Sequence, residues 1–439
     1  MKRLLINLSL LALGAIATVA PFAASAGAQT VVSGTGNPDV DIPAVQAAVD
    51  QGGEVILEGH FSFNKPPTVP MATAFVGGLA TVLVSRAVVI SGTQDGERTI
   101  IEGGTTPFYV EAPGASVTIQ GLRFIRPRGA AIFVYAVSGL VIASCKIEGL
   151  EPLSGGGGGI DIVTSAGVPT PTQPGHPENI SGRLLIANND IDAAGGTALD
   201  NVLGITIFSV GQSPDREVDI HVSGNDIKNV TEPAINLRRV GGRARVEGNV
   251  ITTGPVSSQK APVPEAIRAV NIGSYVIAHN VIHSQWPDPD AIGIGVFSQF
   301  AAWPMESAVV VGNEVTMLPP DGTVFGTLSA GIDIRGFARD NVVSNNRIQG
   351  RARAAVAVDV FRGGIPGNNA FDLNRFDDFE PSHADVFIDT GVTDTLILGQ
   401  RGTVEDHGIN TVILPLRGGP PSGEEMHNAL LEIPFRRLR

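Results

Sequence analysis

The chain has 439 residues, a net charge of −13 at neutral pH, 54 glycines and a single cysteine, Cys145. The negative charge opposes binding to nucleic acid, and to any polyanion unless positive charge is concentrated locally. A lone cysteine excludes an internal disulfide, so packing and hydrogen bonds must stabilise the fold.

Residues 1–28 have the pattern of a secretory signal. Two cations precede an apolar run over 4–20, and small residues follow, which places cleavage at Ala26 or Ala28. At about 17 residues the apolar run is short for a membrane span. We therefore expect an exported protein, periplasmic or extracellular, with no transmembrane segment in the mature chain.

A short helix is predicted over 41–50. Asp41 can cap it, Pro43 is tolerated in its first turn, and two glycines after residue 51 end it before a strand at 54–57. A helix just ahead of stacked strands would cover an end that could otherwise pair with another chain.

From about residue 81 onward, short apolar alternations recur and lead into an Asn-x-Ile/Val triplet. The triplets start at Asn189, Asn225, Asn249, Asn280, Asn313 and Asn346, with weaker matches at Cys145, Asn374 and Asn410. Successive triplets are separated by 24 to 36 residues. Repeats of this length contain several strands and bury their apolar faces only against their neighbours.

The Asn of each triplet has a predicted structural role. Asn tolerates the left-handed backbone angles that a sharp bend between strands requires. When coils stack about 4.8 Å apart, successive Asn amides can hydrogen-bond along the stack, and the following Ile or Val points inward.

The capping helix, the inward Asn ladder and the aliphatic stacks together resemble the right-handed parallel β-helix proteins of the pectin-lyase-like superfamily, over residues 54–415. The resemblance implies an all-β fold, a single right-handed parallel β-helix with an N-terminal capping helix. We assign the signal peptide to 1–28, the β-helix domain to 29–417, and a linker and C-terminal tail to 418–439, and we expect a monomer.

The longest insertion lies between Cys145 and Asn189. It holds a Gly-rich run at 155–159 and a Pro-rich stretch at 169–177. Insertions that collect at one turn of a solenoid build a rim beside one sheet, and that side is often the binding face.

The strand that follows each loop maps an outer face. Aliphatic residues occupy one parity and must face inward, so the alternate residues should face solvent. One predicted outer row is Asp161, Thr206, Asn236, Arg268, Gly293, Asp333 and Ala357, and its neighbour is Val163, Phe208, Arg238, Val270, Gly295, Arg335 and Asp359.

This face suggests a groove for a sugar. Arg268 and Asp333 would lie about 10 Å apart across a smooth glycine coil, which leaves room for a sugar ring. The loop before that coil carries His283, Trp286, Asp288 and Asp290. The alternative is a solvated polar face with Arg335 and Asp359 as a surface ion pair.

For β-helix polysaccharide lyases the resemblance implies an Arg, Lys or His base beside a uronate carboxylate, which cations or calcium neutralise. The predicted catalytic residues are Arg335, Asp333, Asp359 and Asp290. The predicted substrate-binding residues are Asn236, Arg238, Arg268, His283, Trp286 and Asp288. No metal ligand is assigned, although Ca²⁺ is a candidate cofactor. The acidic cluster of Asp372, Asp377, Asp378 and Glu380 lacks the spacing of a calcium loop, which favours a solvated turn.

The motifs of named activities are incomplete in this chain. The sequence from Asp288 to Asp290 is similar to the Asp-Pro-His-Asp signature of alginate epimerases without its His. The polygalacturonase motifs and the Trp-Ile-Asp-His signature of pectate lyases are absent. The fold by itself does not carry a function.

The sequence therefore favours a polysaccharide lyase or epimerase that acts on a uronate-containing glycan, because the groove has several arginines and no closely paired acids. Hydrolysis needs two carboxyl groups about 5–9 Å apart, which Asp333 could form with Asp359 or Asp290. A non-catalytic envelope protein that binds a glycan or a protein partner is the other alternative, so enzymatic activity is left open.

Overall fold

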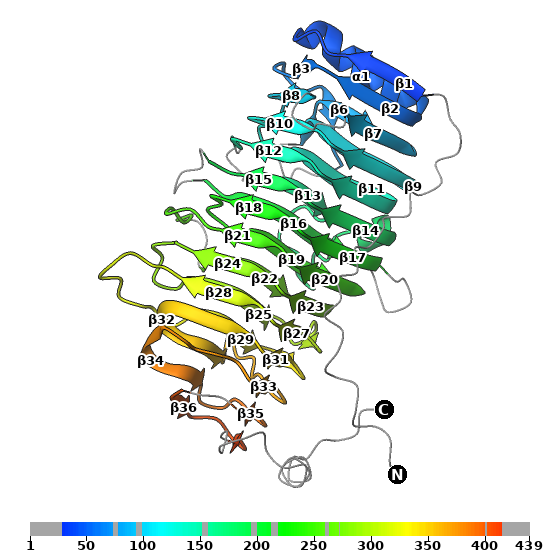
Figure 1. Ribbon diagram of the computed structural model, residues 1–439. Helices are drawn as coiled ribbons and strands as arrows, with labels where there is room; N and C mark the ends of the chain where they lie inside the picture. The colour runs from blue at the N-terminus through cyan, green and yellow to red at the C-terminus, as the bar shows by residue number, and fades with distance from the viewer. Residues whose placement is uncertain are drawn as a thin grey trace, which may run out of the picture.

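The computed structural model describes residues 29–72, 78–93, 99–151, 157–194, 200–211, 218–259, 263–271, 273–399 and 402–414. These residues form one elongated stack of strands with a helix at its N-terminal end (Figure 1). The predicted signal peptide at 1–28 and the predicted tail at 418–439 lie outside the described residues. No helix within the described ranges has the length and apolarity that a membrane crossing needs.

The helix α1 (Pro38–Gln51) is longer than predicted and is capped by a different residue. The side chain of Asn37 accepts a hydrogen bond from the N–H of Asp39 at 3.0 Å, so Asn37 is the N-cap. Asp41 is instead buried in the helix, where it accepts hydrogen bonds from the N–H groups of Thr35 and Ser62, each at 2.8 Å. The carboxylate thus ties α1 to the first coil, and the predicted capping role of Asp41 is wrong.

In the described chain, 33 strands belong to one continuous sheet in which neighbouring coils pair in parallel (Figure 1). Each coil contributes to three ladders. The first ladder contains β6 (Val82–Val84), β9 (Phe108–Gln120), β11 (Ile132–Ala143), β13 (Gly157–Val163), β16 (Val202–Val210), β19 (Ile235–Val240), β22 (Glu265–Val270), β25 (Ile292–Ser298), β29 (Ala330–Gly336), β32 (Arg347–Asp359), β34 (Phe379–Ile388) and β36 (Val404–Asp406).

The other two ladders complete each coil. The second contains β1 (Gln29–Ser33), β2 (Gly53–Glu58), β7 (Val88–Gly92), the later halves of β9 and β11, β14 (Gly182–Ala187), β17 (Val218–Ser223), β20 (Arg243–Glu247), β23 (Ser274–Ala278), β27 (Val309–Val311), β31 (Val342–Ser344), β33 (Ala370–Asp372), β35 (Leu396–Leu398) and β37 (Val412–Leu414). The third contains β3 (His60–Ser62), β8 (Ile100–Glu102), β10 (Arg123–Ile125), β12 (Lys146–Glu148), β15 (Asp190–Asp192), β18 (Asp226–Lys228), β21 (Val250–Thr252), β24 (Val281–Ser284), β28 (Glu314–Met317) and the starts of β32 and β34.

Short elements decorate this stack. They are the antiparallel pair β4 (Val69–Pro70) and β5 (Leu79–Ala80), the parallel pair β26 (Met305–Glu306) and β30 (Ala338–Arg339), and the 3₁₀ helix η1 (Pro177–Asn179). The predicted all-β solenoid with an N-terminal capping helix is therefore confirmed.

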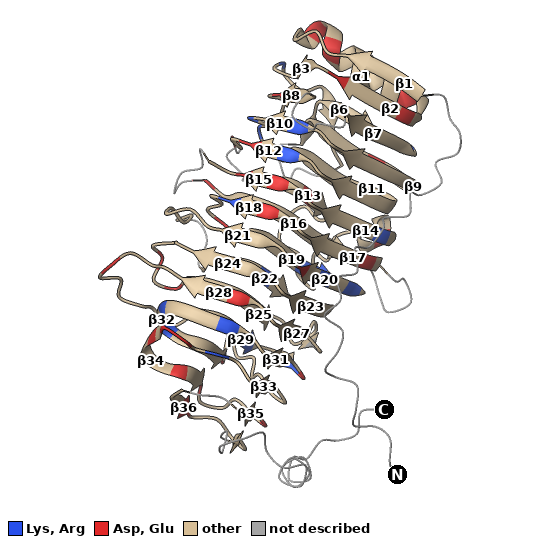
Figure 2. Cartoon of the chain, in the orientation of Figure 1, with Lys and Arg blue, Asp and Glu red and all other residues tan. Residues whose placement is uncertain are grey.

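Charged residues line the outside of the third ladder. Figure 2 shows basic residues on β10 and β12 and acidic residues on β15 and β18. Several form ion pairs, such as Arg123 with Glu148 at 2.6 Å and Arg347 with Glu314 at 3.4 Å. Because these pairs are partly or largely exposed, each should contribute at most about 1 kcal/mol to stability.

The predicted Asn ladder is confirmed. Seven buried Asn side chains form it: Asn189, Asn225, Asn249, Asn280, Asn313, Asn346 and Asn374. The Nδ2 of each of the first six donates to the Oδ1 of the next Asn at 2.9 Å, and the Nδ2 of Asn374 donates to Val343 O. The left-handed residue is the one before the ladder Asn, for example His279 with φ 54° and Gly312 with φ 64°. The predicted left-handed conformation is thus wrong for the seven ladder Asn residues. It holds for Asn410, with φ 60°, which lies outside the ladder on the surface.

We expect Asn280→Ala to lower the free energy of unfolding by about 1–3 kcal/mol. Asn280 Nδ2 donates to Val246 O and Asn313 Oδ1, and its Oδ1 accepts from Asn249, so the substitution leaves several buried groups unpaired. The shift of the urea-denaturation midpoint measures the effect. Asn64→Ala is the matched control, since the Asn64 side chain is exposed and its backbone is not left-handed, and equal losses in the two variants would contradict a stabilising ladder.

Candidate functional site

The outer face of the first ladder shows the predicted rows with one error of register. The observed rows are Asp161, Thr206, Asn236, Arg268, Gly295, Asp333, Ala357 and Val163, Phe208, Arg238, Val270, Phe297, Arg335, Asp359. On β25 the prediction was two residues too early. Ile292, Ile294 and Val296 share one parity, so the alternation allows two registers. Gly293 points into the core, where an added Cβ would lie 2.5 Å from Val315.

The predicted solvent exposure of these rows is wrong. The exposed fractions are 0% for Asp333, 2% for Arg335 and 4% for Asp359. Asp161, Thr206, Asn236 and Arg268 are buried as well, and Arg238 is half-buried. The alternative of a surface ion pair between Arg335 and Asp359 is also wrong. Both side chains are buried, Arg335 pairs with Glu265 and Asp333, and Asp359 pairs with Arg353.

These buried charges form a network that we call the charge cluster: Glu265, Arg268, Asp333, Arg335, Arg353 and Asp359. Glu265 is fully buried and accepts hydrogen bonds from Arg268 on its own coil and from Arg335 two coils away. Arg335 Nη1 lies 2.8 Å from Asp333 Oδ2, and Arg353 Nη2 lies 2.6 Å from Asp359 Oδ2. Glu265 therefore links Arg268 to the pair of Arg335 and Asp333.

The coil between Glu265 and Arg335 must lack an outward side chain for this contact to form. That coil carries Gly295, and a Cβ added there would lie 2.8 Å from Glu265 Oε1. The space above Gly295, which the sequence suggested as room for a sugar ring, is therefore filled by the Glu265 side chain.

Sequence reasoning missed Glu265 because it shares the parity of Ile267, which alternation assigns to the interior. Ala266 and Ile267 both belong to the hydrophobic core, so two successive residues point inward and Glu265 is left outside. A bulge of this kind adds one residue to the alternation. The one available signal was an acidic residue at an otherwise apolar position.

Burial dominates the electrostatics of the cluster. It raises the pKa of Asp333 well above its usual range, although Arg335 favours the ionised form. Burial likewise raises the pKa of Asp359, against the opposing effect of Arg353. For Arg335 burial opposes the charge, but the nearby carboxylates more than offset it and raise its pKa.

Aromatic rings pack against the guanidinium groups of the face. Arg335 Cζ lies 4.2 Å from the centroid of Phe297 and 5.2 Å from that of Phe361. Arg353 Cζ lies 4.3 Å from the centroid of Phe387. These cation–π contacts stabilise buried charge and leave the same rings less available to a ligand.

The predicted loop residues are not gathered at the charge cluster. Trp286 is buried, with its indole N–H donating to Val230 O at 3.1 Å, so it is a core residue rather than an exposed sugar platform. Asp288 accepts from the N–H of Asp290, and Asp290 accepts from the N–H of Leu328, each at 2.9 Å. His283 lies on β24 of the third ladder. The catalytic and binding roles assigned from sequence stay predictions.

No metal site is assembled in the described part of the chain. There, no three His, Cys, Asp or Glu side chains come together in a way that could hold an ion. Asp372, Asp377, Asp378 and Glu380 accordingly do not converge into the calcium site considered from sequence.

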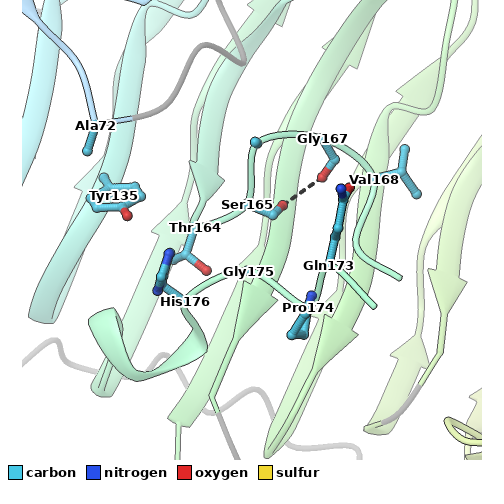
Figure 3. A pocket seen from close by; sticks show the side chains of 11 residues that line it. Ala72, Tyr135, Thr164, Ser165, Gly167, Val168, Gln173, Pro174, Gly175 and His176 are labelled. Atoms are coloured by element: carbon cyan, nitrogen blue, oxygen red, sulfur yellow. Dashed lines mark hydrogen bonds between the residues drawn. The ribbon is translucent and has the colours of Figure 1, made fainter. Parts of the chain in front are cut away.

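An open pocket lies further along the first ladder, toward its N-terminal end. This Tyr135 pocket has a volume of about 380 Å³ and is lined by Ala72, Tyr135, Thr164, Ser165, Ala166, Gly167, Val168, Gln173, Pro174, Gly175 and His176. In Figure 3, Tyr135 and His176 lie on one side, Gln173 and Val168 on the other, and Ser165 between them. The rings of Tyr135 and His176 meet edge to face with centroids 6.5 Å apart.

The loop of the pocket is fixed by bonds to the next coils. Thr164 Oγ1 donates to Ser209 O at 2.6 Å, and Ser209 Oγ donates to Pro174 O at 2.7 Å. Gly175 has a φ of 78°, and an added Cβ would lie 2.8 Å from Ser165 Cβ, so glycine is required there. The pocket is thus built by the long insertion that the sequence marked as a rim.

Comparison with known proteins finds similarity in structure but none to a family model or a curated sequence. No protein-family model matches the chain, and no curated protein sequence matches it. The chain is similar to PfbA, a surface adhesin of Streptococcus pneumoniae, with a TM-score of 0.51 and 13% identity over 89% of this chain and 93% of that one.

Two further solved structures show lower similarity. The A-module of the mannuronan C-5 epimerase AlgE4 of Azotobacter vinelandii has a TM-score of 0.40 and 12% identity over 87% of this chain and 98% of that one. The Dettilon tailspike protein gp208 has a TM-score of 0.38 and 12% identity over 87% of this chain and 68% of that one.

Proposed function

We propose that the chain is an exported, glycan-binding parallel β-helix protein of the pectin-lyase-like fold, and that the Tyr135 pocket receives a segment of the glycan. That the fold is a right-handed parallel β-helix is established by the single parallel sheet and the similarity to PfbA. The observation that carries the proposal is the open pocket with an aromatic wall and a polar rim. Such a combination suits a sugar, which offers both C–H faces and hydroxyl groups.

The state of the charge cluster supports binding rather than turnover. Its acids and arginines are buried and paired with one another, so in this conformation they offer no group to a polymer outside. The exposed polar side chains of Gln173 and His176 are instead available at the rim of the Tyr135 pocket. A binding role is compatible with the fold, since the pneumococcal protein of similar fold is a surface adhesin.

A lyase or epimerase acting on a uronate-containing glycan is the second candidate function. It is favoured by Asp333, a fully buried acid whose pKa is raised well above its usual range and whose two oxygens lack hydrogen-bond partners of good geometry among the described residues. Perturbed acids of this kind are enriched at catalytic sites. Catalysis by Arg335, Asp333, Asp359 and Asp290 would require the cluster to be uncovered.

One screen tests both functions. The mature protein is mixed with neutral and uronate-containing polysaccharides, and we measure retention on each glycan and the absorbance of unsaturated uronates. We expect retention without absorbance, and at least tenfold weaker retention for Tyr135→Ala, because its ring is a wall of the pocket. New reducing ends without that absorbance would indicate a hydrolase.

The matched control is Gln120→Ala, which removes an exposed side chain from β9 away from the pocket. Retention of this variant should equal that of the unmodified chain. Rising absorbance that is lost in Arg335→Ala would establish the lyase instead, and a protein that binds no glycan would contradict the proposed function.

A further inference from the structure

The lining of the Tyr135 pocket carries almost no charge. Among the described residues that line it, none is Lys, Arg, Asp or Glu, and the titratable side chains are Tyr135 and His176. The Nδ1 of His176 lies 3.2 Å from Glu178 Oε1, so even a protonated imidazole would be neutralised by its neighbour.

Two carboxylates, Glu111 and Glu178, act on the wall of the pocket. Burial raises the pKa of Tyr135, and the carboxylates of Glu111 and Glu178 raise it further, while Asn179 lowers it. Both acids therefore act on the phenol that forms the wall of the pocket. The carboxylate of a uronate brought to this wall would be repelled by these two acids.

Arg239 is a cation beside the pocket loop. It donates to the carbonyl oxygen of Pro174, which belongs to that loop, and its guanidinium lies over Trp303 at 4.8 Å from the ring centroid. Its guanidinium is thus engaged by the loop backbone and the Trp303 ring, and Arg239 is not among the residues that line the pocket. The net charge of −13 adds to the repulsion of any polyanion.

We infer that the Tyr135 pocket takes a neutral sugar rather than a uronate, an inference that rests on the proposed glycan-binding function. A neutral sugar needs uncharged donors and acceptors, which the Tyr135 hydroxyl, the Gln173 amide and the His176 imidazole supply. A uronate needs a cation to replace the water around its carboxylate, and none of the described residues that line the pocket is Lys or Arg. The chemistry of the lining therefore separates the two classes of glycan.

The test compares neutral polysaccharides (mannan, xylan and β-glucan) with polygalacturonate and alginate as ligands of the full-length mature protein. We expect binding of at least one neutral glycan at least tenfold tighter than either polyuronate. Tyr135→Ala should weaken the neutral binding at least tenfold, whereas Gln120→Ala should not change it. Gln173→Lys should strengthen polygalacturonate binding severalfold, because it adds the missing cation on an exposed side chain that folding does not need.

The outcomes distinguish failure of the neutral-sugar inference from failure of the proposed glycan-binding function. If polygalacturonate or alginate binds best and Tyr135→Ala abolishes that binding, the pocket holds a uronate, so the neutral assignment is wrong while glycan binding stands. If neither class binds, or if Tyr135→Ala leaves all binding unchanged, the proposed function at this pocket is wrong and the inference is overturned with it.

Discussion

Glu265→Gln is expected to lower the free energy of unfolding by about 3–5 kcal/mol, although Gln and Glu have nearly the same size and shape. Glu265 is fully buried and accepts hydrogen bonds from both Arg268 and Arg335. The amide keeps one acceptor but presents an N–H₂ group to a guanidinium. It removes the ion-pair partner of Arg268 and leaves Arg335 with its ion pair to Asp333. An uncompensated buried charge is among the most costly single changes in a protein.

The measurement is the shift of the urea-denaturation midpoint relative to the unmodified chain. The matched control is Glu314→Gln, which also removes a carboxylate that faces an arginine on the next coil. The pair of Glu314 and Arg347 has exposed fractions of 42% and 47%, so we expect a loss below about 1 kcal/mol. Equal losses in the two variants would show that Glu265 does not hold the cluster together.

Gly295→Ala tests the same cluster from the other side. The added methyl group would lie 2.8 Å from Glu265 Oε1, so the carboxylate must move away from Arg335. We expect a loss of about 1–3 kcal/mol from this overpacking. If Gly295→Ala were neutral, the close approach of Glu265 across the bare coil would be wrong.

The fold could be predicted from the sequence because a repeat constrains it many times over. Each Asn-x-Ile/Val triplet indicates the register of one coil independently. A wrong register assigned to one coil therefore does not carry over to the next. The weak points were places where the alternation is ambiguous, such as Ile292 to Val296, or interrupted, such as Glu265 to Ile267. Parity alone detects neither the second apolar register nor the added residue of a bulge.

The candidate site was harder to predict because burial on the outside of a sheet depends on segments distant in the sequence. The outer rows were correctly grouped, which brought Arg268, Asp333 and Arg335 together. Their burial could not be foreseen from alternation, which treats every outward residue as solvated. The sequence predicts the long insertion as a rim but does not place His176 against Tyr135. Hydrogen bonds from Ser209 and Arg239, on later coils, to the Pro174 carbonyl oxygen fix the loop that carries His176.

Asp161 is the second position at which a single substitution should have a large effect. It is fully buried on β13, between Phe133 and Thr206 in the outer row. Its Oδ2 accepts from the N–H of Gly158 at 3.3 Å, and its Oδ1 has no hydrogen-bond partner among the described residues. Burial raises the pKa of Asp161 to about 7, against the smaller opposing effects of Gly158 and Thr206.

The raised pKa fixes the sign of a pH dependence. In the unfolded chain an Asp titrates near pH 4, so between about pH 4 and pH 7 the folded state holds a proton that the unfolded state has lost. The favourable contribution of Asp161 is therefore fully present below about pH 4 and disappears as the pH rises through about 7. At pH 8 ionisation of the buried carboxyl lowers the free energy of unfolding by about 2–4 kcal/mol relative to its value below pH 4.

Asp161→Asn should consequently stabilise the protein at pH 8 by about 2–4 kcal/mol and change its stability little at pH 4, because the amide keeps an acceptor for Gly158 but cannot ionise. Urea-denaturation midpoints of both chains between pH 4 and pH 8 measure the difference. Glu54→Gln, which removes an exposed carboxylate from β2, is the control for a general benefit of lower negative charge and should stay within about 0.5 kcal/mol of the unmodified chain. A gain for Asp161→Asn that is the same at both ends of the range would mean that ionisation of this carboxyl is not its source.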